Sequence, residues 1–176
     1  MLYTFEGGSG TRYPQRARWC SKQNPANWDD TVVGGGDFAD AATSDQIISA
    51  QLLQNQLIVF FTNSVWSLIP TSDPNKAFRW QKINNFRSCD GKMASVAYDR
   101  FTGALGIRGI TATDGINTTR IDNRISDFTI EEISQANFDT TFCARDYNNR
   151  RWWTLFSSGD SGNDLGGGIS DDRIYG

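Results

Sequence analysis

The chemistry open to this chain is limited first by the residues that it lacks. Its 176 residues include no histidine and three cysteines, Cys20, Cys89 and Cys143, which are far apart and form no CxxC pair. Histidine is the common general base of hydrolases, and histidine and cysteine are the common zinc ligands. The sequence therefore predicts no Ser-His-Asp or Cys-His catalysis and no metal site, and it favours a protein without enzymatic activity.

Acidic pairs are the remaining source of acid–base chemistry. They occur at residues 29–30, 131–132 and 171–172. Neighbouring residues on a strand point to opposite faces of the sheet, so two adjacent carboxylates do not flank one substrate bond as glycosidase acids do. We interpret these pairs as solvated charges in turns, and we predict no catalytic residue.

The glycine-rich segments do not predict a bound ion or cofactor either. Residues 159–168 contain aspartates, but not at the alternating spacing of an EF-hand loop, and no glutamate follows at the required offset. Residues 34–36 are all glycine, yet no helix with a phosphate-binding lysine follows them. The Asp-Gly pairs at 90–91 and 114–115 resemble turns of sialidase-like propellers, but the aromatic residue expected after them is absent. The sequence predicts no cofactor.

Three β-hairpins are the elements that would position any functional side chain. Each is an aromatic-rich run of β-forming residues, a polar turn and a second such run, over residues 57–69, 95–107 and 141–156. The turns lie near Asn63, Phe101 and Asn148, so they recur roughly every 40 to 45 residues, which is typical of propeller blades. Further strands are expected at residues 46–53, 77–83 and 109–113. The predicted fold class is all-β, with antiparallel hairpin repeats that form propeller-like blades, not necessarily a complete set.

The aromatic content predicts a core between sheets, since the chain contains 6 Trp, 11 Phe and 5 Tyr. In the adjacent pair Trp152-Trp153 one indole is expected in the core and the other on the reverse face. That reverse face is either covered by a neighbouring blade or serves as an interface or sugar-stacking surface. The residues expected to be buried are Phe60, Trp66, Leu68, Ile107, Phe142, Leu155 and one of this tryptophan pair.

Residues 1–45 differ from the remainder in composition. Glycine, proline and asparagine punctuate this segment, so we expect an irregular N-terminal arm, followed by a β-repeat domain over residues 46–176. Residues 16–20 alternate and favour one short strand. Trp19 and Trp28, with Arg16 and Arg18 beside the first, are the candidate interface residues, docking either on another chain or on the protein's own domain.

Charge and hydropathy exclude two classes of partner. The net charge is −3, the sequence pI is about 4.9 and no basic stripe occurs, so a sequence-independent grip on nucleic acid is not expected. No apolar run approaches the roughly 20 residues of a membrane span, and no signal peptide is visible at the N-terminus. The odd number of widely spaced cysteines favours reduced, buried thiols and synthesis in a cytosol.

Several segments resemble a family of tailed-bacteriophage structural proteins. Residues 11–20 (TRYPQRARWC) and 24–28 (NPANW) are similar to the "YPQRVRWS…NPxxW" segment that precedes the repeats of that family. Residues 37–38, 45–47, 56–60 and 64–68 resemble its "GDxIV…LLVFxxxSVW" blade. Residues 150–156 (RRWWTLF) and 172–175 (DRIY) resemble its later "R-x-WW…D-R-x-x-x-Y" hairpin. The likeness covers most of the chain in short elements, although the family's proteins are usually much longer.

The resemblance implies a β-propeller-containing protein of the tail or the head–tail connector, such as a podovirus tail nozzle or hub. Such proteins form homo-oligomeric rings around the DNA channel, together with other tail and connector proteins. We therefore expect a virion protein that is assembled in the host cytoplasm. DNA is expected to pass through its channel only as cargo. The alternative is a carbohydrate-binding or glycan-cleaving propeller. Since three hairpins do not close a propeller, the chain is expected to be a fragment or to be completed by its neighbours.

Overall fold

The computed structural model describes residues 2–6, 11–32, 35–73, 76–86, 88–122, 135–149 and 151–155. Over these residues the chain is all-β, and the strands of every sheet are paired antiparallel. The helical structure in the described part is the six-residue 3-10 helix η2 (Gln135–Thr140). The predicted all-β class with antiparallel hairpins is confirmed.

Four sheets follow one another along the described part of the chain. The first contains β1 (Leu2–Glu6), β2 (Thr11–Trp19) and β3 (Asp37–Asp40). The second contains β4 (Ile47–Leu53), β5 (Gln56–Phe61), β6 (Val65–Pro70) and β7 (Phe78–Asn84). The third contains β8 (Ser95–Ala97), β9 (Thr102–Gly106), β10 (Gly109–Thr113) and β11 (Thr118–Arg120). The fourth contains β12 (Phe142–Asp146) and β13 (Arg151–Leu155).

The three predicted hairpins are present at the expected turns. β5 pairs with β6 across the turn that contains Asn63, and β12 pairs with β13 across the turn that contains Asn148. Between β8 and β9 the Tyr98 N–H donates to the Phe101 carbonyl at 2.8 Å, and the two rings stack with centroids 4.6 Å apart. The strands expected at residues 46–53, 77–83 and 109–113 are confirmed as β4, β7 and β10.

The N-terminal segment is not an irregular arm, and that part of the prediction is wrong. Residues 1–45 contain a three-stranded antiparallel sheet in the order β1-β2-β3. The alternation noticed over residues 16–20 belongs to β2, a longer strand that begins at Thr11. Its partners β1 and β3 are short strands beside segments rich in turn residues, and β3 also pairs with β2 across a long loop, so composition and local alternation do not reveal them. The predicted domain boundary after residue 45 stays a prediction.

The first sheet is joined to the second by aromatic side chains of β7. The indole N–H of Trp80 donates to the Ala39 carbonyl of β3 at 3.0 Å. The rings of Trp19 and Phe78 meet edge to face with centroids 5.2 Å apart. These contacts make the N-terminal sheet part of one continuous stack with the sheets that follow.

The central strands β5 and β6 of the second sheet are buried on both faces. Along β5, Ile58 and Phe60 enter the core shared with the third sheet, whereas Val59 and Phe61 enter a core on the opposite face. All four residues are at most 1% exposed. A strand covered on both sides is expected to be apolar at successive positions, and the sequence QLIVFF has that pattern.

The third sheet is also enclosed, and a glycine in its strand β9 lets the fourth sheet approach closely. Every residue of β9 is buried. A Cβ placed on Gly103 would lie 2.3 Å from Cζ3 of the Trp152 ring, so the indole of the fourth sheet packs directly on this glycine. Glycine is needed here for close approach.

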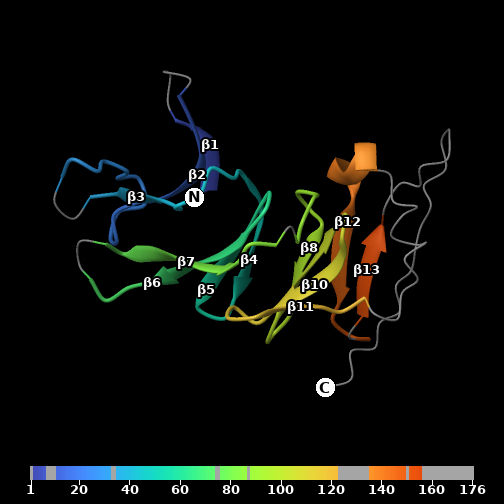
Figure 1. Ribbon diagram of the computed structural model, residues 1–176. Helices are drawn as coiled ribbons and strands as arrows, with labels where there is room; N and C mark the ends of the chain where they lie inside the picture. The colour runs from blue at the N-terminus through green and yellow to red at the C-terminus, as the bar shows by residue number, and fades with distance from the viewer. Residues whose placement is uncertain are drawn as a thin grey trace.

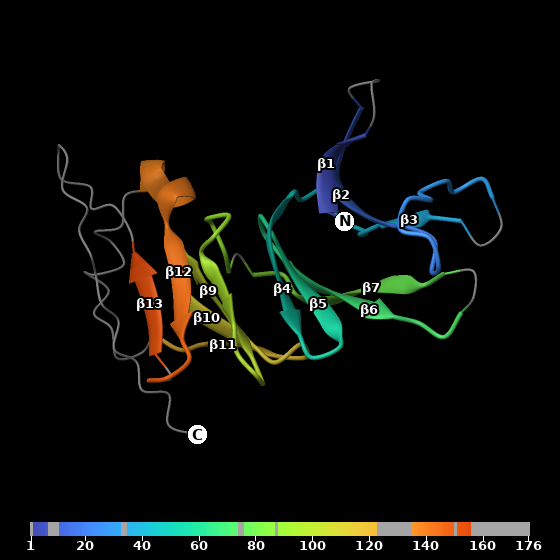
Figure 2. The same cartoon turned by 180° about the vertical axis from the view of Figure 1, so that it is seen from behind.

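The sheets meet through their first strands. β1 contacts β4, β4 contacts β8, and β8 contacts β12, while β3 contacts β7 at the other edge of the first two sheets. Figure 1, and Figure 2 from behind, show the sheets succeeding one another across the molecule, from β1–β3 on one side to β12–β13 on the other. The arrangement is a row of antiparallel sheets stacked face against face.

The predicted core is right at most positions and wrong at two. Phe60, Trp66 and Leu68 are buried, as is Trp152 of the tryptophan pair, while Ile107 is half-buried against the main core. Phe142 and Leu155, expected to be buried, are 38% and 50% exposed. They are cross-strand partners and lie on the face of the fourth sheet that is turned away from the third.

Candidate functional site

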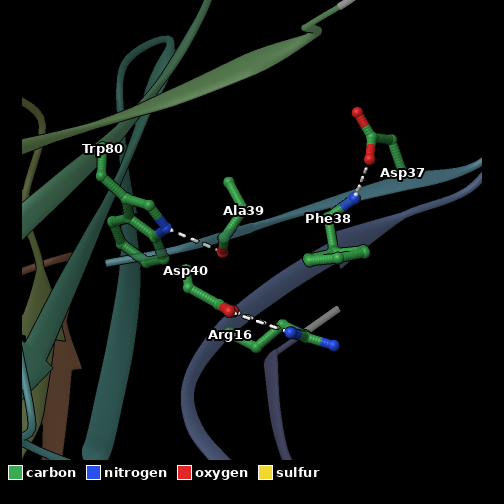
Figure 3. A network of polar contacts seen from close by, with 6 residues as sticks. All are labelled: Arg16, Asp37, Phe38, Ala39, Asp40 and Trp80. Atoms are coloured by element: carbon green, nitrogen blue, oxygen red, sulfur yellow. Dashed lines mark hydrogen bonds and ion pairs between the residues drawn. The ribbon is translucent and has the colours of Figure 1, made fainter. Parts of the chain in front are cut away.

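Arg16 occupies the centre of a closed network on the first sheet (Figure 3). Its Nε and Nη2 donate to Oδ1 and Oδ2 of Asp40 at 2.8 and 2.9 Å, a two-point pairing across neighbouring strands. The guanidinium also lies between two rings, with Cζ 3.7 Å from the Tyr13 centroid and 3.8 Å from the Phe38 centroid. Only arginine combines a planar two-point donor with two stacking faces, so lysine would not replace it.

The other predicted interface residues hold the loop between β2 and β3. Arg18 Nη2 donates to the Trp28 carbonyl at 2.6 Å, and the Ser21 N–H donates to the Asn27 carbonyl at 2.8 Å. A Cβ on Gly36 would lie 2.7 Å from the Trp28 Cα, so the loop returns tightly against the strand. Trp19 and Trp28 are both half-buried.

All four predicted interface residues therefore lie in one sheet and its loop. Arg16 is 7% exposed and is bound on all sides by its own sheet, which leaves little of it for another chain. The Trp19 ring packs on Phe78, also within the chain. Docking on the protein's own domain, the second of the two alternatives, is what these contacts provide. An interface with another chain at these residues stays a prediction.

A polar seam joins the first strands of the second and third sheets. The hydroxyls of Ser49 and Ser95 are 2.7 Å apart, and Gln51 Nε2 donates to the Ser95 carbonyl at 3.0 Å. Ser49 Oγ also contacts the Lys92 carbonyl at 2.9 Å. Hydrogen bonds at this edge fix how closely β4 approaches β8, and hence the angle at which one sheet follows the next.

The fourth sheet has one covered face and one open face. Trp152, Cys143 and Thr154 point toward the third sheet and are at most 7% exposed. The opposite face presents the residues that alternate with these: the apolar Phe142, Ala144, Trp153 and Leu155, and the charged Asp146 and Arg151 at the turn end. None of the four apolar residues is buried. Apolar side chains gathered on one exposed face are typical of a surface that another element covers.

Carboxylates singled out in the sequence serve as caps of turns. Asp114 accepts the N–H groups of Asn117 and Ile116 at 2.7 and 2.8 Å, and these hydrogen bonds lower the pKa of Asp114. Asp29 is exposed, and hydrogen bonds from Thr31 lower the pKa of its carboxyl. The interpretation of residues 29–30 as solvated charges is confirmed. The pairs at 131–132 and 171–172 and the loop at 159–168 lie outside the described residues.

The cysteines behave as small buried hydrophobes at two of their three positions. Cys89 and Cys143 are buried, burial raises the pKa of both thiols, and Cys20 is half-buried. All three are free thiols. In the part of the chain that the structure describes, no three His, Cys, Asp or Glu side chains are grouped as a metal site would require. No described helix is long and apolar enough to cross a membrane.

Sequence reasoning missed a cavity of about 630 Å³ between the second and third sheets. It is lined by two arginines, a phenylalanine, an asparagine and two threonines that come from both sheets: Arg108, Arg120, Phe86, Asn84, Thr111 and Thr118. These residues form no motif, because they are separated by up to 36 positions and only the stacking of the sheets brings them together.

No protein-family model matches this chain, and no curated protein matches it at a significant level.

Proposed function

We propose that the protein is a non-enzymatic structural component of a phage tail or head–tail junction, which assembles in a ring around the DNA channel. The observation that carries the proposal is the stacking of successive antiparallel sheets through their first strands, β1, β4, β8 and β12. In a β-propeller the blades are four-stranded antiparallel sheets arranged radially around a channel. The second and third sheets match such a blade in strand number and order.

Burial supports treating the four sheets as successive blades. A blade within a propeller is covered on both faces by its neighbours, and this holds for the central strands of the second and third sheets, β5, β6, β9 and β10. The polar seam of Ser49, Gln51 and Ser95 lies along the first strands, where a propeller has its channel. The resemblance of the sequence to tailed-phage tail proteins supports the same assignment.

The open face of the fourth sheet supports assembly. Phe142, Trp153 and Leu155 form the kind of surface that a further blade covers, whether in the same polypeptide or in a neighbour. A contact between two different faces of identical chains is heterologous, and it generates a ring when its rotation closes. The net charge of −3 and the absence of a basic stripe suit a channel that DNA traverses without binding.

The carbohydrate-binding or glycan-cleaving alternative receives less support at the tryptophans. Trp152 is 5% exposed and packs on Gly103, so it presents no stacking face to a sugar. Trp153 is half-buried on the open face, between the apolar pair Phe142 and Leu155 and the charged pair Asp146 and Arg151. A sugar platform combines an aromatic face with hydrogen-bonding groups; among the described residues of this face such groups are Asp146 and Arg151 at the turn end, where the Asn149 side chain and backbone already donate to Asp146.

Sedimentation velocity and negative-stain microscopy of the purified protein test the proposal. Ring-shaped or tail-like oligomers are the expected result, and mass spectrometry of purified virions should detect the chain in the particle. A monodisperse monomer at micromolar concentration, with no larger species in virions, would refute assembly. Monomers that bind specifically on a glycan array would favour the alternative.

A further inference from the structure

A groove of about 480 Å³ runs along the free edge of β4. Five consecutive residues of this strand, 47–51, line it. Successive side chains of a strand point to opposite faces of the sheet, so a space that touches all five lies beside the strand rather than over one face. β4 is the first strand in the order β4-β5-β6-β7, so its other edge has no strand partner in the described part of the chain. The groove therefore follows an unpaired strand edge.

The register of β4 on β5 determines which backbone groups face this groove. Leu53 and Gln56 flank a turn of two residues, and the pair that flanks such a turn exchanges both of its hydrogen bonds. Bonded and non-bonded pairs alternate along the strands, so Gln51 also bonds with β5, whereas Ala50 and Leu52 direct their N–H and C=O groups away from it. Ala50 lines the groove, and among the described residues no backbone group outside the sheet bonds with it. The backbone of Ala50 can therefore pair with an incoming strand.

Hydrogen bonds hold the opposite wall of the groove in place. The Met93 carbonyl accepts the Cys143 N–H at 2.9 Å, which fixes this wall to β12. The Lys92 carbonyl accepts the Ser49 hydroxyl at 2.9 Å, and the hydroxyls of Ser49 and Ser95 are 2.7 Å apart, so the polar seam joins the two walls. The groove is therefore formed in the absence of a ligand, which lowers the ordering cost of binding.

The side chains along the groove indicate what kind of strand would fit. Among the described residues that line it, Lys92 is the charged one, and it is exposed and forms no ion pair with a described residue. Met93 is 58% exposed, and Ile47 and Ile48 are half-buried. Methionine adapts its shape to different partners and is common at peptide-binding surfaces. A complementary segment would combine an extended backbone, apolar side chains and a carboxylate.

We propose that the free edge of β4 binds an extended acidic peptide, which adds to the second sheet as a further strand. The peptide backbone would exchange hydrogen bonds with the N–H and C=O groups of Ala50, and a carboxylate side chain would pair with Lys92. Apolar side chains of the peptide would lie against Met93 and Ile48. Residues 47–51 span about 16 Å at roughly 3.3 Å per residue, so the groove matches a peptide of about five residues. This inference concerns binding by a single chain and is independent of the proposed assembly.

An NMR titration with three capped pentapeptides tests the proposal. The first is Thr-Val-Glu-Val-Thr, the second has Gln in place of Glu, and the third is the first with every backbone nitrogen methylated. We expect the first to bind with a dissociation constant of about 1 mM or lower, to shift the backbone amides of Ala50 and Lys92, and to slow hydrogen exchange at Ala50. The Gln peptide should bind about threefold or more weakly, because it lacks the charge. The methylated peptide should not bind, because it has no N–H to donate. No binding of the first peptide, or equal binding of the methylated one, would overturn strand addition, and equal binding of the Gln peptide would overturn the preference for an acidic partner.

The matched variants are Lys92→Gln and Lys22→Gln. Lys22 is an exposed lysine between β2 and β3 that does not line the groove. Lys92→Gln should weaken binding of the Glu peptide by about threefold or more and make it equal to that of the Gln peptide, whereas Lys22→Gln should leave both affinities unchanged. Unchanged melting temperatures confirm that both variants fold. Equal loss in the two variants would indicate nonspecific attraction to positive charge and overturn the assignment of the carboxylate to Lys92.

Discussion

The second and fourth sheets each contain a strand with adjacent large apolar residues, but the two strands differ in what covers them. β5 (QLIVFF) and β13 (RWWTL) both place large apolar residues at successive positions. In β5 both faces are buried, by the third sheet on one side and the first on the other. In β13 one face packs on the third sheet, while Leu155 on the other face is 50% exposed.

Under the proposed assembly, the difference indicates where a further sheet would dock. A strand that is apolar on both faces has the composition of one covered on both sides. The first sheet has a different outward face, where Arg16 is enclosed by Asp40, Tyr13 and Phe38 in a closed polar and aromatic network. An apolar open face docks another sheet more readily than a face whose charges are already paired. The proposed assembly would therefore add a further sheet at the fourth sheet.

Trp66→Ala should have the largest effect, since Trp66 belongs to the doubly covered sheet. It is 6% exposed, and its ring meets Phe61 and Trp80 edge to face. We expect a loss of about 3–5 kcal/mol in unfolding free energy, measured by urea denaturation. Trp153→Ala on the open face is the matched control and should lose markedly less. Equal losses would contradict the contrast between the two sheets.

Gly103→Ala should have the next largest effect on stability, because the added methyl group would push the third sheet away from the fourth. The added methyl group would lie 2.3 Å from the Trp152 ring. Overpacking of this kind costs about 1–3 kcal/mol, which a lower melting temperature would reveal. Adding Trp152→Leu should cost less in the Gly103→Ala background than in the wild type, since the smaller side chain relieves the clash. Strict additivity would mean that the two residues do not touch.

The loss of stability at acid pH that comes from carboxylates capping turns should be small, and it should occur in both the third and the fourth sheet. Hydrogen bonds from the backbone N–H groups of Asn117 and Ile116 hold the pKa of Asp114 below its usual 3.8. A group with a lowered folded-state pKa stabilises the fold above its unfolded pKa, and this contribution disappears as the pH falls through the folded pKa. Asp114→Asn should therefore reduce stability at pH 7 by less than about 1 kcal/mol and flatten its decline below about pH 4.

The corresponding residue of the fourth sheet is Asp146. Hydrogen bonds from the Asn149 side chain and backbone lower the pKa of its carboxyl, and they close the β12–β13 turn. Asp146→Asn should flatten the acid limb in the same direction as Asp114→Asn, as measured by unfolding between pH 7 and pH 2.5. A pH response confined to one of the two variants would show that turn capping differs between the sheets.

Leu155→Asp should have the smallest effect on the isolated chain and the clearest effect on assembly. Since Leu155 is half exposed, its replacement should change unfolding free energy by no more than about 0.5 kcal/mol. A charge on the open face should nevertheless prevent oligomers from forming, as seen by sedimentation. Leu52→Asp is the control, because Leu52 is 65% exposed near the β4–β5 turn and away from that face. Assembly that survives Leu155→Asp would exclude this face as the contact.

Local pattern was sufficient to predict the hairpins, but it was insufficient for the first sheet. The turns at Asn63, Phe101 and Asn148 join strands that are close in sequence, so alternation and turn residues identify both partners. β3, in contrast, contains four residues and pairs with β2 across a loop of 17 residues, from Cys20 to Gly36. A strand so short carries little periodic signal, and its existence depends on the pairing itself.

The candidate site residues were predicted by type but not by role. Arg16, Arg18, Trp19 and Trp28 are grouped in sequence, and grouped aromatic and basic residues favour an interface. The partner of Arg16 is Asp40, which lies 24 positions away and was not singled out. The cavity residues were not predicted either, because neither sheet alone contains the site.

By itself the sequence determined the all-β class, the places of the main turns and the lack of histidine chemistry. These properties depend on residue types and on neighbours within a few positions, where backbone preference and side-chain alternation act. Only the tertiary structure decided which faces are covered, that Arg16 is enclosed, and that Asn84, Arg108 and Thr118 line one cavity. Those outcomes depend on the stacking of separate sheets, and the free energy of that stacking comes from contacts between residues far apart in the chain.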